Sequence, residues 1–91
     1  MTDVEWINAF IGEDVIAEIG DGFTVYGTLS ELALGHLVFT QADLHNQREA
    51  NSTSEIYAIE AKTIGVRPNR ERLCVPLHRL IAISRIADVV T

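Results

Sequence analysis

The stretch GDGFTVYGTL, residues 20–29, decides the fold of this chain. It opens with Gly20-Asp21-Gly22, three residues that tolerate the positive φ angles of a tight hairpin turn. Apolar and polar residues alternate before this turn, and the alternation resumes after it. Such alternation is typical of strands that bury one face. The sequence therefore predicts a β-hairpin with strands over about 13–19 and 23–30.

Three further strands are predicted outward from this hairpin. One covers about 36–42, with Leu37 and Phe39 facing inward, and two more cover about 72–76 and 80–86. Gly27 lies inside the second strand, where a glycine is costly unless the chain bends sharply or approaches another segment closely. The fold class is therefore mainly β, a strongly bent five-stranded antiparallel small barrel.

A helix over residues 3–11 is predicted to precede the strands and to pack on the sheet. Thr2 or Asp3 can cap its first turn, and Gly12 follows as a stop. The side chains at helical spacing are Val4, Ile7, Phe10 and Ile11.

Residues 43–71 differ in composition and form a polar insert between the third and fourth strands. Ser52 and Glu55 have the spacing of a capping box, which favours a short helix over 56–64. The same residues also alternate like a strand, so both interpretations stay open. Residues 1–91 are predicted to form a single domain, because a chain of 91 residues supports one core.

Charge is distributed unevenly along the chain. The formal net charge is −6, and the first 47 residues contain neither Lys nor Arg. Five arginines lie in the last third: Arg67, Arg70, Arg72, Arg79 and Arg85. We expect ion pairs between the acidic first part and the basic last part. The acidic balance weighs against nonspecific binding to phosphate backbones, although a local basic patch can outweigh it.

The cysteine count and the hydropathy of the chain indicate the cellular compartment to expect. The single cysteine, Cys74, excludes an intrachain disulfide and is predicted to be a buried thiol between Leu73 and Val75. No secretory signal is visible, and no apolar run approaches the ~20 residues that span a bilayer. We therefore expect a cytoplasmic protein without a membrane partner.

Two segments together resemble a known family. Residues 12–15, 20–29 and 36–39 resemble the first conserved block of Sm-like (LSm) proteins, and Val75–Ile83 resembles the second. The resemblance covers about two thirds of the chain. It implies an N-terminal helix on a bent five-stranded antiparallel sheet. It also implies a homo-oligomeric ring closed through edge strands 4 and 5, with single-stranded, uridine-rich RNA bound at the inner rim.

This chain departs from the family at the RNA pocket. The family places an Asn before strand three, a stacking side chain two positions earlier, and an Arg-Gly pair in the second block. Here those positions hold His36, Leu34 and Pro76-Leu77. Leu32 occupies a further position, two before Leu34, at which the family has an acidic residue. The resemblance therefore implies a non-standard rim, with the following candidate nucleic-acid-binding residues: His36, Pro76, His78 and Arg79.

The sequence favours a ring-forming, RNA-binding module, with a scaffold ring that recruits a protein partner as the alternative. No phosphate loop, nucleophile elbow or HExxH motif is present, so no enzyme activity, cofactor or metal is predicted. Asp43 and His45 are spaced to share a metal, but two ligands are too few. A small enzyme that uses Asp43, His45 and Glu60 is a distant third hypothesis.

Overall fold

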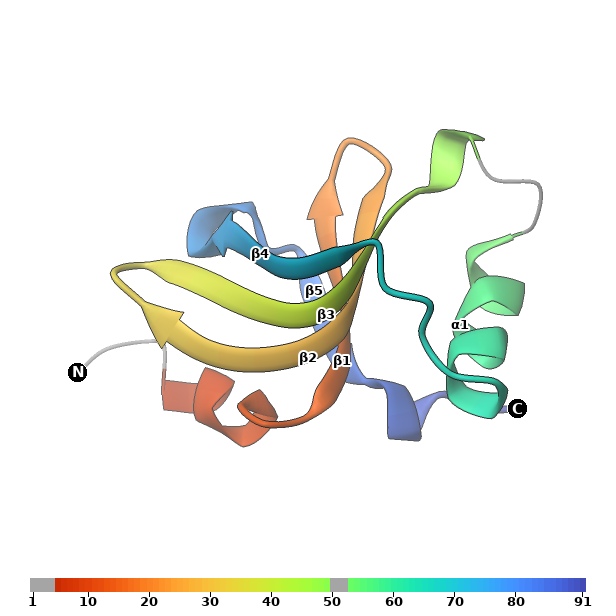
Figure 1. The fold of residues 1–91 in the computed structure, drawn as a ribbon, viewed down its shortest axis with the longest axis horizontal. Coiled ribbons are helices and arrows are strands. Elements are labelled where there is room, and N and C mark those ends of the chain that lie inside the picture. The colour runs from red at the N-terminus through yellow and green to blue at the C-terminus, as the bar shows by residue number, and fades with distance from the viewer. Residues whose placement is uncertain (1–4, 50–52) are drawn as a thin grey trace.

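The computed structural model describes residues 5–49 and 53–91 (Figure 1). The expected caps Thr2 and Asp3, the apolar residue Val4 and the capping-box residue Ser52 lie outside the described residues.

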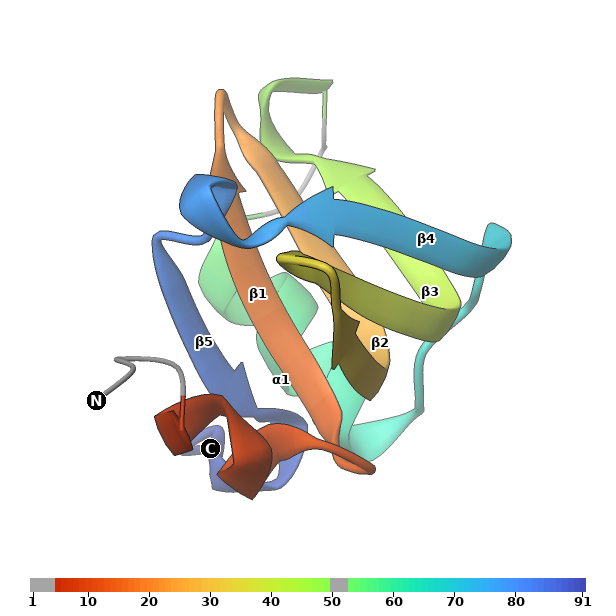
Figure 2. The same ribbon diagram turned by 90° about the vertical axis from the view of Figure 1, so that its left-hand side faces the viewer.

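Five antiparallel strands form one bent sheet in the order β4-β3-β2-β1-β5. The strands are β1 (Asp14–Gly20), β2 (Phe23–Ala33), β3 (His36–Asn46), β4 (Arg70–Pro76) and β5 (Ala82–Arg85). The mainly β, five-stranded fold class is thus confirmed. Strands β4 and β5 form the two edges, and Figure 2 shows β4 crossing in front of β2, with the turn after β4 in front of β1.

Several strand boundaries differ from the sequence prediction. Strand β2 continues to Ala33 rather than 30, and β3 continues to Asn46 rather than 42, so the connection to β4 covers only residues 47–69. The polar composition after residue 42 suggested a loop, yet Asp43 pairs with Tyr26 in the register of β2 and β3. Polar residues continue the strand here because they lie on a face that another element covers.

The last predicted strand is shorter than expected. Strand β5 begins at Ala82, because Leu77–Arg79 forms the 3-10 turn η3, and the chain then runs extended to β5. The strand ends at Arg85, where Ile86–Asp88 forms another 3-10 turn, η4, and Ile86 turns into the second hydrophobic cluster. Residues 80, 81 and 86 of the predicted strand therefore belong to its flanks.

Gly27 is explained by a close approach between β2 and β3. A Cβ atom built at Gly27 would lie 2.9 Å from the Ala42 Cα, which is backbone and cannot swing aside. The register between the two strands shifts at this point, between Tyr26 and Thr28. Glycine is therefore required for the strands to remain in contact where the sheet bends.

The concave face of the sheet holds the main apolar core. Its buried side chains come from four strands and from η1 (Glu5–Phe10): Ile7, Val15, Ala17, Val25, Leu29, Leu37, Phe39, Ala42 and Val75. The helix expected before the strands is present as a short 3-10 helix that ends at Phe10 rather than 11, and Ile7 is its buried residue. In Figure 2 it lies at one end of β1 and β5.

The opposite face of the sheet is covered by α1 (Ser54–Thr63), so the helical interpretation of 56–64 is correct and the strand interpretation is wrong. The Thr53 hydroxyl accepts a hydrogen bond from the Ile56 amide at 3.2 Å and caps the helix. Ala61 of α1 joins Tyr26 and Ile86 in a second buried cluster.

The expected pairing between the acidic and basic parts of the chain is present. Arg79 Nη2 lies 2.8 Å from Asp21 Oδ2, and Arg85 Nη1 lies 3.7 Å from Glu13 Oε1. Both pairs are exposed, so each contributes only about 0–1 kcal/mol to stability.

Cys74 is exposed, which corrects the predicted buried thiol. Its neighbours Leu73 and Val75 pack toward the core, so the alternation of β4 turns Cys74 to the other face. In the described residues, no helix combines the length and the apolar character needed to cross a membrane.

Candidate nucleic-acid interface

The predicted rim residues come from two segments that the fold brings side by side. His36 opens β3 and pairs in register with Pro76, the last residue of β4. The Leu77 amide donates a hydrogen bond to the Gly35 carbonyl at 2.8 Å, which fastens the corner after β4 to the turn between β2 and β3. Two segments some 40 positions apart in the sequence therefore form one end of the molecule.

His36 presents a defined hydrogen-bonding edge at this end. Its Nδ1 atom lies 3.0 Å from the Leu34 carbonyl oxygen, which can only accept, so Nδ1 carries the hydrogen. The neutral ring then offers Nε2 as an acceptor to a ligand. Leu34 has a φ of +50° and is 99% exposed, so its side chain projects beyond the turn.

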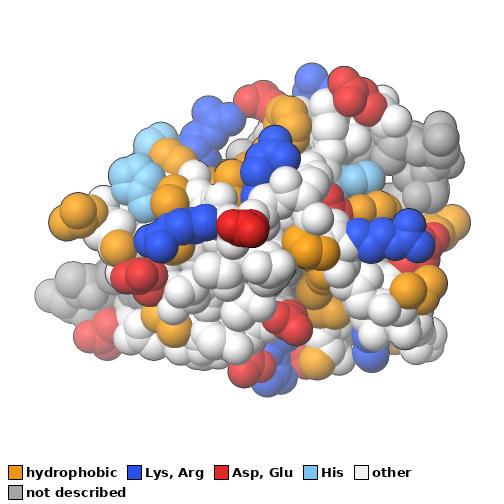
Figure 3. Space-filling view, in the orientation of Figure 1, with side chains coloured by type: hydrophobic (Ala, Val, Ile, Leu, Met, Phe, Trp, Pro, Cys, Tyr) orange, Lys and Arg blue, Asp and Glu red, His pale blue; other side chains and the backbone are white. Residues whose placement is uncertain are grey.

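His78 lies in η3 and is exposed, directly after the Pro76-Leu77 corner. Figure 3 shows histidine side chains at this end of the molecule, with hydrophobic and Lys or Arg side chains beside them. The surface here therefore combines imidazole, apolar and basic groups.

Arg79 is held apart from these groups by its partner. Its guanidinium donates to the Asp21 carboxylate at 2.8 Å, in the turn between β1 and β2. The side chains of Arg79 and Asp21 are 49% and 72% exposed, so the pair is open to solvent and to exchange with a phosphate. Of the four predicted rim residues, the described contacts join His36 with Pro76 and direct Arg79 to the β1–β2 turn.

A second polar cluster, which the sequence analysis left unassembled, lies between α1 and the sheet. The Asp43 carboxylate on β3 accepts hydrogen bonds from the Tyr57 hydroxyl on α1 and from the Asn69 side-chain amide, the latter at 3.1 Å. Asp43 is 6% exposed. These hydrogen bonds fasten the helix and the start of β4 to the sheet through one buried carboxylate.

Aromatic rings surround this carboxylate. The His45 and Tyr57 rings stack with centroids 3.8 Å apart, and the Tyr26 ring meets Tyr57 edge-on at 4.8 Å. Burial, with the nearby Asp43 and Glu18 charges, raises the pKa of Tyr26 to about 12. Burial and the hydrogen bond to Asp43 likewise raise the pKa of Tyr57. Both phenols are therefore neutral hydrogen-bond donors at physiological pH.

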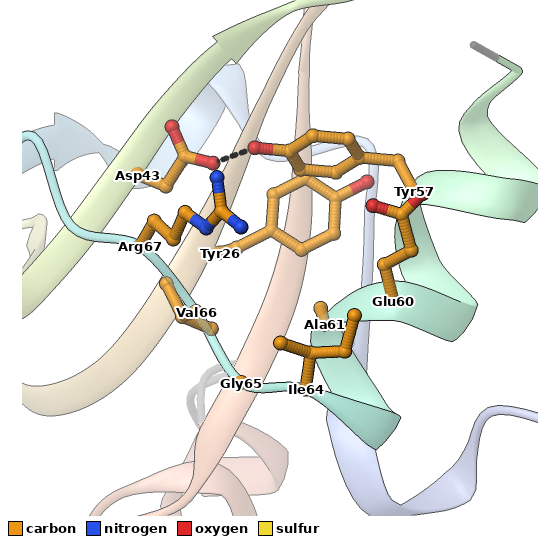
Figure 4. A pocket seen from close by; sticks show the side chains of 9 residues that line it. All are labelled: Tyr26, Asp43, Tyr57, Glu60, Ala61, Ile64, Gly65, Val66 and Arg67. Carbon is orange, nitrogen blue, oxygen red and sulfur yellow. Dashed lines mark hydrogen bonds between the residues drawn. The ribbon is translucent and has the colours of Figure 1, made fainter.

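Beside the cluster lies a hollow of about 130 Å³, drawn in Figure 4. It is bounded by β2, β3, α1 and the segment that follows α1. We call it the α1 hollow, and its lining residues are Tyr26, Asp43, Tyr57, Glu60, Ala61, Ile64, Gly65, Val66 and Arg67.

The two candidate metal ligands lie on a strand, not in the polar insert where the sequence analysis placed them. Asp43 and His45 lie on β3 and face the same side of the sheet, where Asp43 binds Tyr57 and His45 stacks on it. In residues 5–49 and 53–91, no three His, Cys, Asp or Glu side chains are grouped as a metal site requires. Asp43 and His45 were predicted to lie in a loop; the alternation that continues through them, opposite Tyr26 and Thr24, is the one signal that would have placed them on a strand.

Solved structures with the same arrangement of strands settle the fold. A Sm protein from Pyrococcus abyssii, solved in complex with a uridine heptamer, superposes with a TM-score of 0.59 at 15% identity, covering 93% of this chain and 99% of its own. The chain has the Sm fold.

An SmAP (LSm) protein from Methanococcus vannielii supports the same assignment, with a TM-score of 0.57 at 14% identity over 90% of this chain and 91% of that one. No family model and no curated protein sequence matches this chain. The Sm fold that the two sequence blocks implied is therefore confirmed by three-dimensional similarity.

Proposed function

We propose that this Sm-fold chain assembles into a homo-oligomeric ring and binds single-stranded RNA at a modified rim. The observation that carries the proposal is the register of β3 and β4, which sets His36 beside Pro76 at the end of the sheet. These are the positions at which the Sm-like resemblance implies RNA contacts. One protein with the same fold was solved with a uridine heptamer bound.

The two edges of the sheet support assembly. Strands β4 and β5 each have one neighbour, so each leaves a row of backbone donors and acceptors open. An apolar groove runs beside β5, lined by Trp6, Phe10, Leu77, Leu80, Ile81, Ala82 and Ile83. Pairing β4 of one copy with β5 of the next satisfies both edges and covers this groove, and a closing rotation leaves no edge free.

Assembly is tested by light scattering on the purified protein. We expect a discrete multimer, and Ile81→Glu should shift the mass toward the monomer, because Ile81 is 70% exposed in the groove. Ile56→Glu is the matched control, since Ile56 is 49% exposed on α1 and does not line the groove. A wild-type monomer at all concentrations would overturn the ring.

RNA binding is tested by fluorescence anisotropy with a labelled uridine heptamer over a salt series. We expect the affinity to fall as salt rises, because phosphate contacts release counterions. His36→Ala and Arg79→Ala should each weaken binding. Arg85→Ala is the matched control for Arg79, because both arginines are about half exposed and lie in surface ion pairs. If neither rim variant changes the affinity, the rim assignment is wrong.

Two observations favour the alternative, a ring that acts as a protein-interaction scaffold. Leu34, at the family's stacking position, is an aliphatic side chain that is 99% exposed, and Arg79 is already paired with Asp21. An exposed aliphatic tip suits a protein surface better than a base. The alternative predicts the same multimer with a protein-only absorbance ratio and no binding of the heptamer.

A further inference from the structure

The α1 hollow is too small for most organic cofactors and is walled by aromatic rings. Its volume of about 130 Å³ lies below the roughly 300–1,000 Å³ of ordinary ligand pockets. Tyr26 and Tyr57 form one wall, and Ala61, Ile64 and Val66 supply apolar atoms to the others (Figure 4). These surfaces suit one flat ring system.

Two charged side chains in the α1 hollow, Glu60 and Arg67, have no partner among the other lining side chains. Among the nine lining residues, the hydrogen bond drawn joins Tyr57 to Asp43, and none joins Tyr26, Glu60 or Arg67 to another lining side chain. Tyr26 is 1% exposed and belongs to the second buried cluster, so it forms the floor of the hollow rather than a free polar group. The ion pairs of the described residues include neither Glu60 nor Arg67.

The charges in the α1 hollow are of both signs. Arg67 reaches in from the segment after α1, and Glu60 reaches in from α1 on the opposite side (Figure 4). Arg67 repels a purely cationic group that enters the hollow, and Glu60 and the Asp43 carboxylate repel a purely anionic one. The lining is complementary to a flat edge that carries donors and acceptors together.

We propose that the α1 hollow binds a guanine base, free as a nucleotide or as part of a single-stranded RNA. Guanine presents two adjacent donors, N1–H and the N2 amine, which match a carboxylate, and its O6 and N7 acceptors match a guanidinium. Glu60 accepts from the donor edge, Arg67 donates to the acceptor edge, and the half-buried Tyr57 ring contacts the base. This site depends neither on the ring nor on the rim.

Titration calorimetry with three nucleotides of equal charge tests the base. We expect guanosine monophosphate to bind and inosine monophosphate, which lacks the N2 amine, to bind at least about tenfold more weakly, because a hydrogen bond to a charged group is lost. Adenosine monophosphate should bind more weakly still, because adenine places an acceptor at N1 against Glu60 and an amine at position 6 against Arg67. Equal affinity for all three nucleotides would show that the base edge is not recognised.

Two substitutions locate the site. Glu60→Gln and Arg67→Gln should each weaken guanosine monophosphate by about tenfold or more, whereas Glu55→Gln, on the same helix but outside the α1 hollow, should leave binding unchanged. Glu60 and Arg67 are both exposed, so the variants are expected to fold. Unchanged binding in both variants would place any guanine site elsewhere.

Two oligoribonucleotides distinguish the sources of the base. One is an adenosine heptamer with a central guanosine, and the other carries inosine at that position. Binding of the free nucleotide assigns the α1 hollow to a guanine nucleotide, and preference for the guanosine heptamer alone assigns it to RNA. If neither probe shows a guanine preference, the proposal is overturned, while the rim proposal is still judged on the uridine heptamer.

Discussion

The two faces of the bent sheet are buried in different ways. The concave face buries aliphatic and aromatic side chains around Phe39 and Leu29, both fully buried. The opposite face buries a carboxylate, Asp43, under α1, with a phenol and an amide donating to it. The first face is stabilised by burial of apolar area, an effect that does not depend on the orientation of the side chains. The second is stabilised by hydrogen bonds, which require specific partners. The faces should therefore respond differently to substitution.

The largest effect is expected on the concave face. Phe39→Ala should lower the free energy of unfolding by about 3–5 kcal/mol, because Phe39 is fully buried and its removal leaves a cavity. Urea unfolding at fixed protein concentration measures the change. Phe23→Ala is the matched control, since Phe23 is 36% exposed and should lose much less. Equal losses in the two variants would mean that the core is not where the structure places it.

The next effect tests the hydrogen bonds on the opposite face. Tyr57→Phe keeps the ring and removes the hydroxyl that donates to Asp43, so we expect a loss of about 1.5–3 kcal/mol. Thr28→Val removes a hydroxyl that donates to Asp14 at 2.6 Å in an exposed setting, and it should cost under about 1 kcal/mol. If the two losses are alike, burial of Asp43 does not strengthen the hydrogen bond that it accepts from Tyr57.

Alkaline pH should weaken the α1 face selectively. The pKa of Tyr26 is raised from 10.0 to about 12, and that of Tyr57 is raised as well, so the folded state favours both neutral phenols. Their contribution to stability is complete below pH 10 and is lost as the pH rises toward 12. Urea midpoints across this range, with absorbance near 295 nm to follow phenolate, measure the loss. In Tyr57→Phe the decline should be shallower; an identical decline would exclude Tyr57 as a source.

The smallest effect on stability is expected at the surface. Arg79→Ala breaks an exposed pair with Asp21 and should change the free energy of unfolding by less than about 1 kcal/mol. A thermal or urea unfolding curve checks this result alongside the RNA titration. A large loss of stability would mean that Arg79 supports the fold, and a weakened RNA titration would then need another explanation.

The concave face could be predicted from the sequence because alternation is a local pattern. Val25, Leu29, Leu37 and Phe39 occupy alternating positions that fix which side of each strand is buried. The close approach at Gly27 was also expected, since glycine inside a strand requires a reason. Two short blocks of sequence thus sufficed for the Sm fold, even at 14–15% identity to solved structures.

The α1 face could not be predicted because its contacts are between distant residues. Asp43, Tyr57 and Asn69 lie in three separate segments, and each is an ordinary polar residue on its own. Their polarity suggested an exposed insert from 43 to 71, whereas mutual hydrogen bonding lets Asp43 be buried on β3. Likewise, no spacing rule indicates that Arg79 reaches Asp21, because that pair depends on the corner after β4.

The exposed thiol on β4 provides a direct test of the proposed assembly. Cys74 is the only cysteine of the sequence, and it lies exposed on an edge strand of the isolated sheet. A second strand laid along that edge crowds the sulfur from one side, so a thiol-reactive dye should label it more slowly. The labelling rate as a function of protein concentration then measures the fraction of molecules whose β4 edge is free, without an engineered labelling site.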